Sequence, residues 1–220
     1  MNIIDELKSI INEYNLLNHP MYQAWSQGML SMDVLKDYAI QYYQQVASFP
    51  RFITRVHTNC DDINVRKVLV QNLVDEEIHG TDHPALWMQF ALGMGASRDE
   101  VVNAKPYAET DYMVNQYYHL AERDWHDGLC ALFAYECQVP EVSASKIAGL
   151  KDHYGITADE TLAFFNAHQV YDVEHSAQVA ALIESTITDK EAARKATREA
   201  AHALWKFLDG MCDKHGIVCH

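Results

Sequence analysis

Apolar residues in this chain recur every three to four positions, the spacing that places side chains on one face of an α-helix. The first residues show the pattern clearly, because Ile3, Leu7, Ile10, Ile11 and Tyr14 form one stripe. No stretch alternates apolar and polar residues with the period of two that a half-buried strand requires. The pattern therefore predicts an all-α protein.

Helix-breaking residues and capping signals divide this pattern into about seven helices, one further segment being only a short turn. The breaks fall at Pro20, Pro50, Pro84, Pro106, Pro140, Gly93, Gly95, Gly149 and Gly155. The expected helices cover residues 2–18, 31–59, 62–92, 98–104, 108–138, 142–154, 158–186 and 189–212. Three of their starts fit a capping box, namely Ser97 with Glu100, Thr157 with Glu160, and Thr188 with Glu191.

The length and composition are those of one compact domain. A chain of 220 residues with 49% hydrophobic content can bury a sizeable core, and no linker composition interrupts it. We expect a single domain over residues 1–212 and a flexible tail over 213–220. The end of the chain contains Cys212, His215, Cys219 and His220, which would suit a soft metal, although a frayed terminus is the simpler interpretation.

The charge and cysteine content exclude several classes of partner. A net charge of -14 disfavours binding to nucleic acids and to anionic lipid surfaces. The five cysteines are widely scattered, which is typical of a reducing cytoplasm rather than of a disulfide framework. The first residues do not form a signal peptide, and no apolar run approaches the length of a membrane span. We therefore expect a cytoplasmic protein without nucleic-acid or membrane partners.

The segment HQVYDVEH carries the clearest candidate chemistry. Asp172 and His175 follow His168 by four and seven residues, so the three side chains share one face of a helix. The two histidines lie roughly 10 Å apart along the axis, with the carboxylate between them. This arrangement suits two metal ions bridged by a carboxylate.

Two other segments supply candidate ligands. Glu76 and His83 repeat the seven-residue step, although Gly80 and Pro84 predict a bend between them. Glu136 lies in the apolar stretch LCALFAYECQV, where an ionised carboxylate is costly unless a charge or a metal compensates it. Spacing alone does not exclude other nearby groups, namely Glu77, His79, Asp82 and Glu174.

Three histidines and three carboxylates form a ligand set that suits divalent iron or manganese and can leave positions open for dioxygen. The simpler interpretation of each histidine alone is a hydrogen-bonded core or surface residue. The occurrence of all three segments in one chain favours a two-metal site that performs redox chemistry.

These segments resemble a known family. LVDEEIHGTDH, AYECQVP and FNAHQVYDVEH are similar to the metal-binding segments of haem-oxygenase-like diiron oxidases. LNHPMYQAWSQG, YYQQVASFPRF, NCDDINVRKVLVQNLVDEE and LWMQFALG extend the resemblance over nearly the whole chain, to the family of the chlamydial protein associating with death domains. The resemblance implies a seven-helix haem-oxygenase-like bundle without haem, a homodimer, and an Fe/Fe or Mn/Fe centre that requires dioxygen and an external reductant.

The resemblance also implies a function, the synthesis of para-aminobenzoate for folate by an enzyme that consumes its own side chains. The tyrosine that supplies the ring falls on Tyr22, and the lysine that supplies the amino group falls on Lys146. Tyr135 matches a further tyrosine that serves as a radical relay or an alternative donor. Phe164 departs from the family pattern, which has a tyrosine there, and Tyr171 is a candidate substitute.

Three other functions remain open at this point. The first is a multiple-turnover diiron oxidase or oxygenase acting on an external amine or fatty acid. The second is a non-enzymatic interaction module, because the chlamydial relative is named for binding death domains. The third is a metal-free, thiaminase-like hydrolase with Cys130 or Cys137 as its nucleophile. Metal dependence separates these alternatives.

Overall fold

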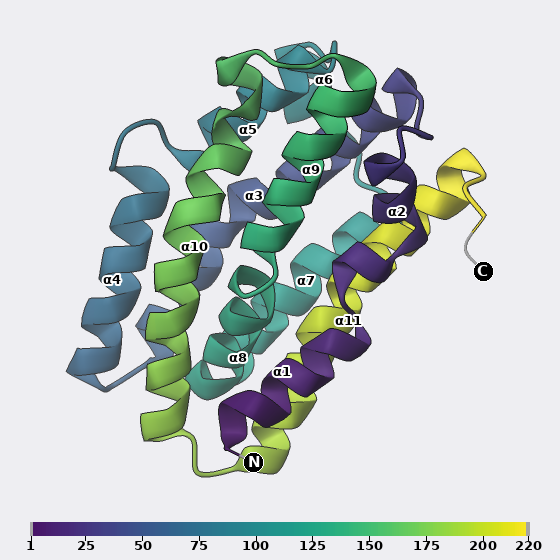
Figure 1. Ribbon diagram of the computed structural model, residues 1–220. Coiled ribbons are helices and arrows are strands. Elements are labelled where there is room, and N and C mark those ends of the chain that lie inside the picture. The colour runs from purple at the N-terminus through teal and green to yellow at the C-terminus, as the bar shows by residue number, and fades with distance from the viewer. Residues whose placement is uncertain (1, 219–220) are drawn as a thin grey trace.

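The computed structural model describes residues 2–218, and these residues form helices and no strand, which confirms the all-α prediction. The helices pack into one elongated bundle (Figure 1). They are α1 (Ile3–Glu13), the 3-10 helix η1 (Leu16–Asn18), α2 (Pro20–Ser26), α3 (Met32–Asn59), α4 (Ile63–Glu77), α5 (His83–Gly93), α6 (Arg98–Val102), α7 (Ala108–Arg123), α8 (Trp125–Glu136), α9 (Val139–Tyr154), α10 (Asp159–Thr186) and α11 (Lys190–His215).

The expectation of seven helices was wrong for the described residues, because several predicted helices are divided. The predicted helix 62–92 breaks where Gly80 has a φ of 75°, a left-handed conformation that glycine adopts without strain. The predicted helix 108–138 breaks at Asp124, whose backbone is extended and whose side chain accepts a hydrogen bond from the backbone N–H of His126. Pro50, by contrast, lies inside α3 and does not end it.

One of the three predicted capping boxes is present. Ser97 and Glu100 make both hydrogen bonds of the motif at the start of α6. The other two were wrong by one residue, because Ala158 and Asp189 occupy the N-cap positions of α10 and α11. The Asp189 carboxylate already accepts the backbone N–H groups that Thr188 was expected to cap.

The last helix extends further than expected. It ends at His215 rather than at residue 212, and Gly216 follows it in a left-handed conformation. Cys212 is buried in the core, and His215 pairs with Asp37, so neither is presented for a tail metal site. Cys219 and His220 lie outside the described residues.

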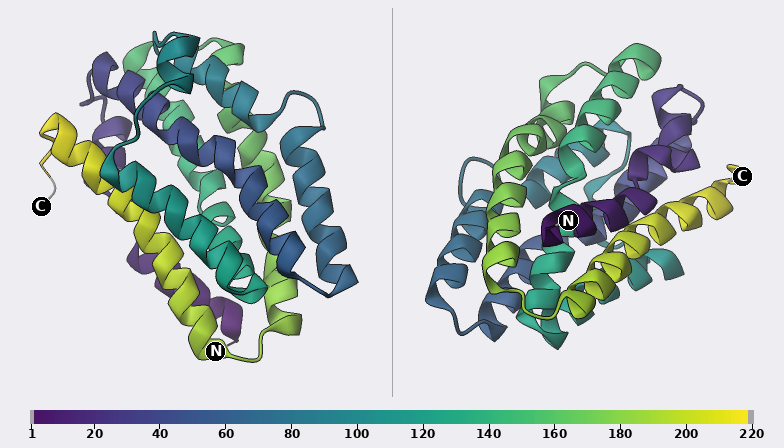
Figure 2. Two further views of the ribbon diagram at one scale, coloured as in Figure 1. Left: turned by 180° about the vertical axis from the view of Figure 1, so that it is seen from behind. Right: turned by 60° about the horizontal axis from the view of Figure 1, so that its bottom comes forward.

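The arrangement of the bundle places α8 at its centre. Helix α10 packs against α5, α8 and α9, while α11 packs against α1, α7 and α8 (Figure 2). Every residue from Asp127 to Glu136 is buried, as expected for a helix covered on all sides. A Cβ atom at Gly128 would lie 2.4 Å from a methyl group of Val56, so this glycine permits the close approach of α8 to α3. The centre of the bundle is therefore closely packed.

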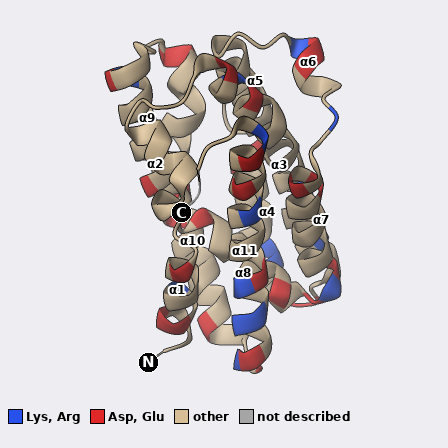
Figure 3. Ribbon diagram, turned by 90° about the vertical axis from the view of Figure 1, so that its right-hand side faces the viewer, with Lys and Arg blue, Asp and Glu red and all other residues tan. Residues whose placement is uncertain are grey.

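The outside of the bundle is acidic. Asp and Glu residues are spread over many helices rather than gathered into one patch (Figure 3). Among the described residues, no helix combines the length and the apolar character that crossing a membrane requires.

Candidate metal centre

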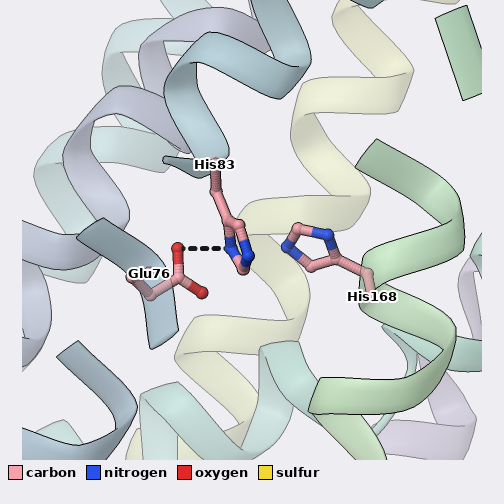
Figure 4. A group of neighbouring side chains, drawn as sticks. All are labelled: Glu76, His83 and His168. Atoms are coloured by element: carbon pink, nitrogen blue, oxygen red, sulfur yellow. Dashed lines mark ion pairs between the residues drawn. The ribbon is translucent and has the colours of Figure 1, made fainter. Parts of the chain in front are cut away.

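Three of the predicted ligands meet where α4 ends and α5 begins. Glu76, His83 and His168 are buried, and one potential ligand atom from each lies within 4.8 Å of the others (Figure 4). The Nδ1 atom of His83 is 2.8 Å from Oε2 of Glu76, and the two histidine ring centroids are 4.3 Å apart. The bend at Gly80, which the sequence predicted, allows the first residue of α5 to face the last turn of α4.

The other three predicted ligands lie in the same buried region. Glu136 is the last residue of α8, while Asp172 and His175 lie on α10. The Nδ1 atom of His175 is 3.8 Å from Oδ1 of Asp172 and 3.9 Å from Oε1 of Glu136. The charge of Glu76 raises the pKa of both Asp172 and Glu136, so the two groups of three share one electrostatic environment. The fold therefore brings all six side chains together.

The polar atoms of this region have too few partners without a cation. Oε2 of Glu136, Oδ2 of Asp172 and Nδ1 of His175 are buried and make no hydrogen bond. Nδ1 of His83 also lacks a well-directed hydrogen bond, despite its proximity to Glu76. Each unsatisfied buried group costs about 1–3 kcal/mol. Divalent metal ions would satisfy these atoms, and the mixed nitrogen and oxygen set fits iron or manganese.

Contacts behind two of the histidines leave one ring nitrogen of each free to bind metal. Nδ1 of His168 donates to the carbonyl oxygen of Phe164 at 2.7 Å, so its Nε2 keeps a lone pair. Nε2 of His175 donates to Oδ2 of Asp75 at 3.0 Å, so its Nδ1 has a lone pair once the ring is neutral. These contacts fix the two rings in orientations that suit metal ligands.

The sequence did not predict two residues on α4 that support the candidate ligands. Nδ2 of Asn72 donates to Oε1 of Glu136 at 2.6 Å, and Asp75 contacts both His175 and His79. Asn72 lies one helical turn before Glu76, and this spacing was the only available signal. The alternative ligands Glu77, His79, Asp82 and Glu174 are all exposed.

Burial and charge shift the proton affinities of the centre. Burial raises the pKa of Glu136 to about 8, with Asp172 adding to the effect, and burial raises that of Asp172 to about 6. Burial lowers the pKa of His175, but the carboxylates of Asp172, Glu136 and Asp75 outweigh it and raise the value to about 9. Without metal, the coupled pair of Glu136 and His175 therefore binds protons more tightly near neutral pH than the free side chains do.

Metal affinity should consequently rise with pH. A metal ion binds the ionised carboxylate of Glu136 and the neutral ring of His175, so binding displaces the protons that they hold. We expect the apparent affinity for Fe²⁺ or Mn²⁺ to increase from about pH 6 to about pH 9. Anaerobic metal titrations across this range measure it, and an affinity that does not change with pH would contradict the assignment.

Asp75→Asn should weaken metal binding without unfolding the protein. The substitution removes the carboxylate that orients His175, and the loss of such an outer contact lowers metal affinity by about 10- to 100-fold. Metal titration of the variant measures the change, with Asp111→Asn on the exposed surface of α7 as the matched control. Equal affinities in the two variants would show that Asp75 does not support the centre.

The two residues that the resemblance assigned to product formation are neighbours. Lys146 on α9 is buried, and its Nζ donates to Oη of Tyr38 at 2.6 Å. The same Tyr38 oxygen lies 2.7 Å from Oη of Tyr22. Nζ of Lys146 is 4.6 Å from the ring centroid of Tyr22. The amine and the phenol ring are thus held in one closed aromatic site.

A series of aromatic contacts connects this site with Tyr135. The rings of Tyr38 and Tyr42 stack with centroids 5.5 Å apart, and the hydroxyl of Tyr42 donates to Oη of Tyr135 at 3.3 Å. Tyr135 directly precedes Glu136. Sequence reasoning missed Tyr38 and Tyr42, because nothing distinguishes them among the 12 tyrosines except their contacts.

Phe164 lies between the metal centre and the aromatic site. Its ring stacks on His168 with centroids 3.9 Å apart. It also lines a small cavity of about 10 Å³, together with Tyr22, Tyr135 and Lys146. We call this cavity the inner chamber. Tyr171 is outside it and half-exposed, with its ring 6.2 Å from that of His83.

Cys130 and Cys137, the two candidate nucleophiles, lack the environment of an activated thiol. Burial raises the pKa of the Cys130 and Cys137 thiols to about 12, so neither is an activated nucleophile near neutral pH. A thiaminase-like reaction at these positions has no support from the structure.

Comparison with known proteins identifies the family of this chain. Residues 36–208 match the family described as iron-containing redox enzymes. The 4-aminobenzoate synthase of Chlamydia muridarum (strain MoPn / Nigg) is 35% identical over 100% of this chain and 94% of its own length. The 4-aminobenzoate synthase of Nitrosomonas europaea is 36% identical over 97% of this chain and 93% of its own length.

A solved structure confirms the fold class. A domain of unknown function with a haem-oxygenase-like fold, from Shewanella denitrificans OS217, superposes with a TM-score of 0.81. It shares 14% identity, and the match covers 96% of this chain and 91% of that one. The chain therefore has the haem-oxygenase-like fold and belongs to the family of iron-containing redox enzymes.

Proposed function

We propose that this oxidoreductase makes 4-aminobenzoate, taking the aromatic ring from Tyr22 and the amino nitrogen from Lys146. The observation that carries the proposal is the position of the Lys146 amine, 4.6 Å from the Tyr22 ring centroid in a closed site beside six candidate metal ligands. The names of the relatives that align over nearly the whole chain support the product.

Glu76, His83 and His168 would hold one metal ion, and Glu136, Asp172 and His175 the other. Two iron ions, or one manganese and one iron, would supply oxidising equivalents from dioxygen when an external reductant is present. The protein's own contribution is to hold the ring and the amine in contact and to exclude water from them.

The protonation states of the two reacting side chains suit this role. Burial lowers the pKa of Lys146 well below its ordinary value. The surrounding aromatic rings favour the charged amine by about 0.5–2 kcal/mol, whereas burying an ion costs several kcal/mol, so burial prevails. A neutral amine has a free lone pair with which to form a bond to carbon. Burial also raises the pKa of Tyr22 well above its ordinary value, which keeps the phenol protonated until it is oxidised.

Tyr38 and Tyr42 offer a route between Tyr22 and the metal centre that does not need a tyrosine at position 164, where this chain has phenylalanine. Their contacts lead from Tyr22 to Tyr135, the neighbour of Glu136, without using position 164. We propose that these tyrosines serve as the relay in this chain, so that the missing tyrosine at Phe164 and the exposed Tyr171 are not required.

Isotope labelling tests the origin of the product. Protein carrying ring-labelled tyrosine, given metal, reductant and dioxygen, should yield labelled 4-aminobenzoate, and the peptides containing Tyr22 and Lys146 should change mass. The yield should not exceed one product per chain. The variant Tyr112→Phe, at an exposed position on α7, is the control and should react normally.

Three results would overturn the proposal. Unlabelled product, or unchanged peptides despite product formation, would show that the side chains are not consumed. Oxidation of an added amine or fatty acid over many turnovers would favour an ordinary diiron oxidase. The predicted homodimer and the requirement for an external reductant stay predictions, the former measurable by sedimentation equilibrium.

A further inference from the structure

A surface pocket lies between α1 and the start of α9. It has a volume of about 280 Å³, near the lower limit for small-molecule sites. On the α1 side it is lined by Lys8, Asn12 and Asn15, and on the α9 side by Gln138 and Glu141. We call it the outer pocket. The proposed reaction assigns it no role.

The outer pocket is separated from the inner chamber by a thin wall. Val142 lines both spaces. Leu16 of η1 lines the inner chamber, and the next residue, Leu17, lines the outer pocket. Three further pockets on the surface of the bundle share no lining residue with the inner chamber. The wall formed by η1 and the first turns of α9 is therefore the barrier between the reacting side chains and the outer pocket.

This wall combines the buried side chain of Leu16 with a side-chain hydrogen bond between η1 and α9. Helix η1 is a single 3-10 turn, a form with weaker hydrogen-bond geometry than an α-helix. The backbone N–H of Leu16 donates to Oε1 of Gln138 at 3.1 Å, and this bond ties η1 to the start of α9. Nε2 of Gln138 in turn donates to the carbonyl oxygen of Ala134 at 3.1 Å. A side-chain hydrogen bond of this kind contributes about 0.5–1.5 kcal/mol, and exposing the buried side chain of Leu16 costs about 1.5–3 kcal/mol more. The sum is smaller than the free energy of unfolding of a typical domain, about 5–15 kcal/mol, so brief local opening of η1 is accessible.

The product requires such an opening. The inner chamber, of about 10 Å³, has room for little more than one water molecule, whereas a benzene ring with two substituents is far larger. The ring of Tyr22 can stay in the site while it belongs to the chain, but after release from the backbone it must pass through a wall.

We propose that the outer pocket receives 4-aminobenzoate as it leaves and that η1 is the gate. The inference rests on the proposed function. Lys8 supplies the positive charge that an aromatic carboxylate requires, on a protein whose net charge of -14 otherwise repels anions. Asn12 and Asn15 offer amide donors, Glu141 can accept from the aromatic amine, and Leu17 offers an apolar contact for the ring.

Binding to unreacted protein tests the pocket directly. 4-Aminobenzoate added to the metal-free full chain should bind saturably, and Lys8→Ala should weaken binding by about tenfold, as expected for the loss of one charge pair. Lys195→Ala, at an exposed position on α11, is the matched control. Absence of binding, or equal binding by Lys8→Ala and Lys195→Ala, would overturn the proposed pocket.

Product release tests the gate. After one reaction, total product is measured in denatured protein and free product in a rapid filtrate. Leu17→Trp, which fills the outer pocket, should slow the release of the product that has formed, measured as the free share of the total, by about tenfold. Gln138→Ala, which removes the hydrogen bond to Leu16, should accelerate it. Leu92→Trp, the same exchange at an exposed site on α5, is the control.

The outcomes separate the gate from the chemistry. Release at the wild-type rate in both Leu17→Trp and Gln138→Ala would overturn the gate. If wild-type protein forms no product even after denaturation, the proposed function fails, whereas the binding of added 4-aminobenzoate still decides whether the outer pocket recognises it.

Discussion

Lys146→Met is expected to abolish the formation of 4-aminobenzoate in a protein that remains folded. If the product nitrogen comes from this amine, its removal should lower the yield by about a thousandfold or more, as for loss of a reacting group. Methionine has a similar length and no charge, so it can occupy the same buried space. Tyr38 loses one hydrogen-bond donor but keeps its contact with Tyr22. Product assays with metal, reductant and dioxygen measure the effect.

The stability of this variant provides an independent check on the buried amine. Because burial lowers the folded-state pKa of Lys146, the unfolded chain binds a proton that the folded chain does not, and the wild-type protein loses stability as pH falls below about 10. Lys146→Met should lose less stability on acidification than the wild-type protein does. Lys151→Met, at an exposed position on the same helix, should match the wild type in both product yield and pH dependence. Substantial product from Lys146→Met would refute the lysine assignment.

Glu136→Gln is expected to remove the stabilisation that one of the two metal ions confers, the ion that Glu136, Asp172 and His175 would hold. A bound metal at about 100 times its Kd adds about 2.7 kcal/mol, or about 5–10 °C in the melting temperature of a chain of this size. Glutamine retains the shape of Glu136 and an oxygen that accepts from Asn72, but it cannot supply an anionic ligand. Because burial already keeps Glu136 largely protonated near neutral pH, the metal-free variant should be about as stable as the wild type.

Thermal melts with and without Fe²⁺ or Mn²⁺ under anaerobic conditions measure this difference. Glu184→Gln, on the exposed face of α10, is the matched control and should keep the full shift. Product formation should be lost in Glu136→Gln and retained in Glu184→Gln. A full metal-dependent shift in Glu136→Gln would show that this carboxylate is not a ligand.

The ligands on α10 were the part of the site most accessible to sequence reasoning. His168, Asp172 and His175 lie on one uninterrupted helix, so their spacing determines their common face. Glu136 was conspicuous as a carboxylate within an apolar stretch. Glu76 and His83 depended on a bend at Gly80, whose presence could be predicted but whose direction could not, because neighbouring helices determine it.

The supporting groups were beyond prediction for a physical reason. Asn72 and Asp75 contact residues on α8 and α10, and Tyr38 contacts Tyr22 and Lys146, so each acts across a distance in sequence that no local pattern reports. The same limit applies to the fold. The all-α class followed from the periodicity of apolar residues. The helix breaks at Asp124 and before η1 could not be predicted, because they depend on local backbone geometry and no proline or glycine marks them in the sequence.

Anomalous scattering from crystals of the metal-loaded protein, measured at the iron and manganese edges, tests the central claim most directly. We predict two metal ions, one bound by Glu76, His83 and His168 and the other by Glu136, Asp172 and His175. A single ion, no ion beside Glu136, or metal bound only at other residues would contradict the two-metal centre on which the proposed function depends.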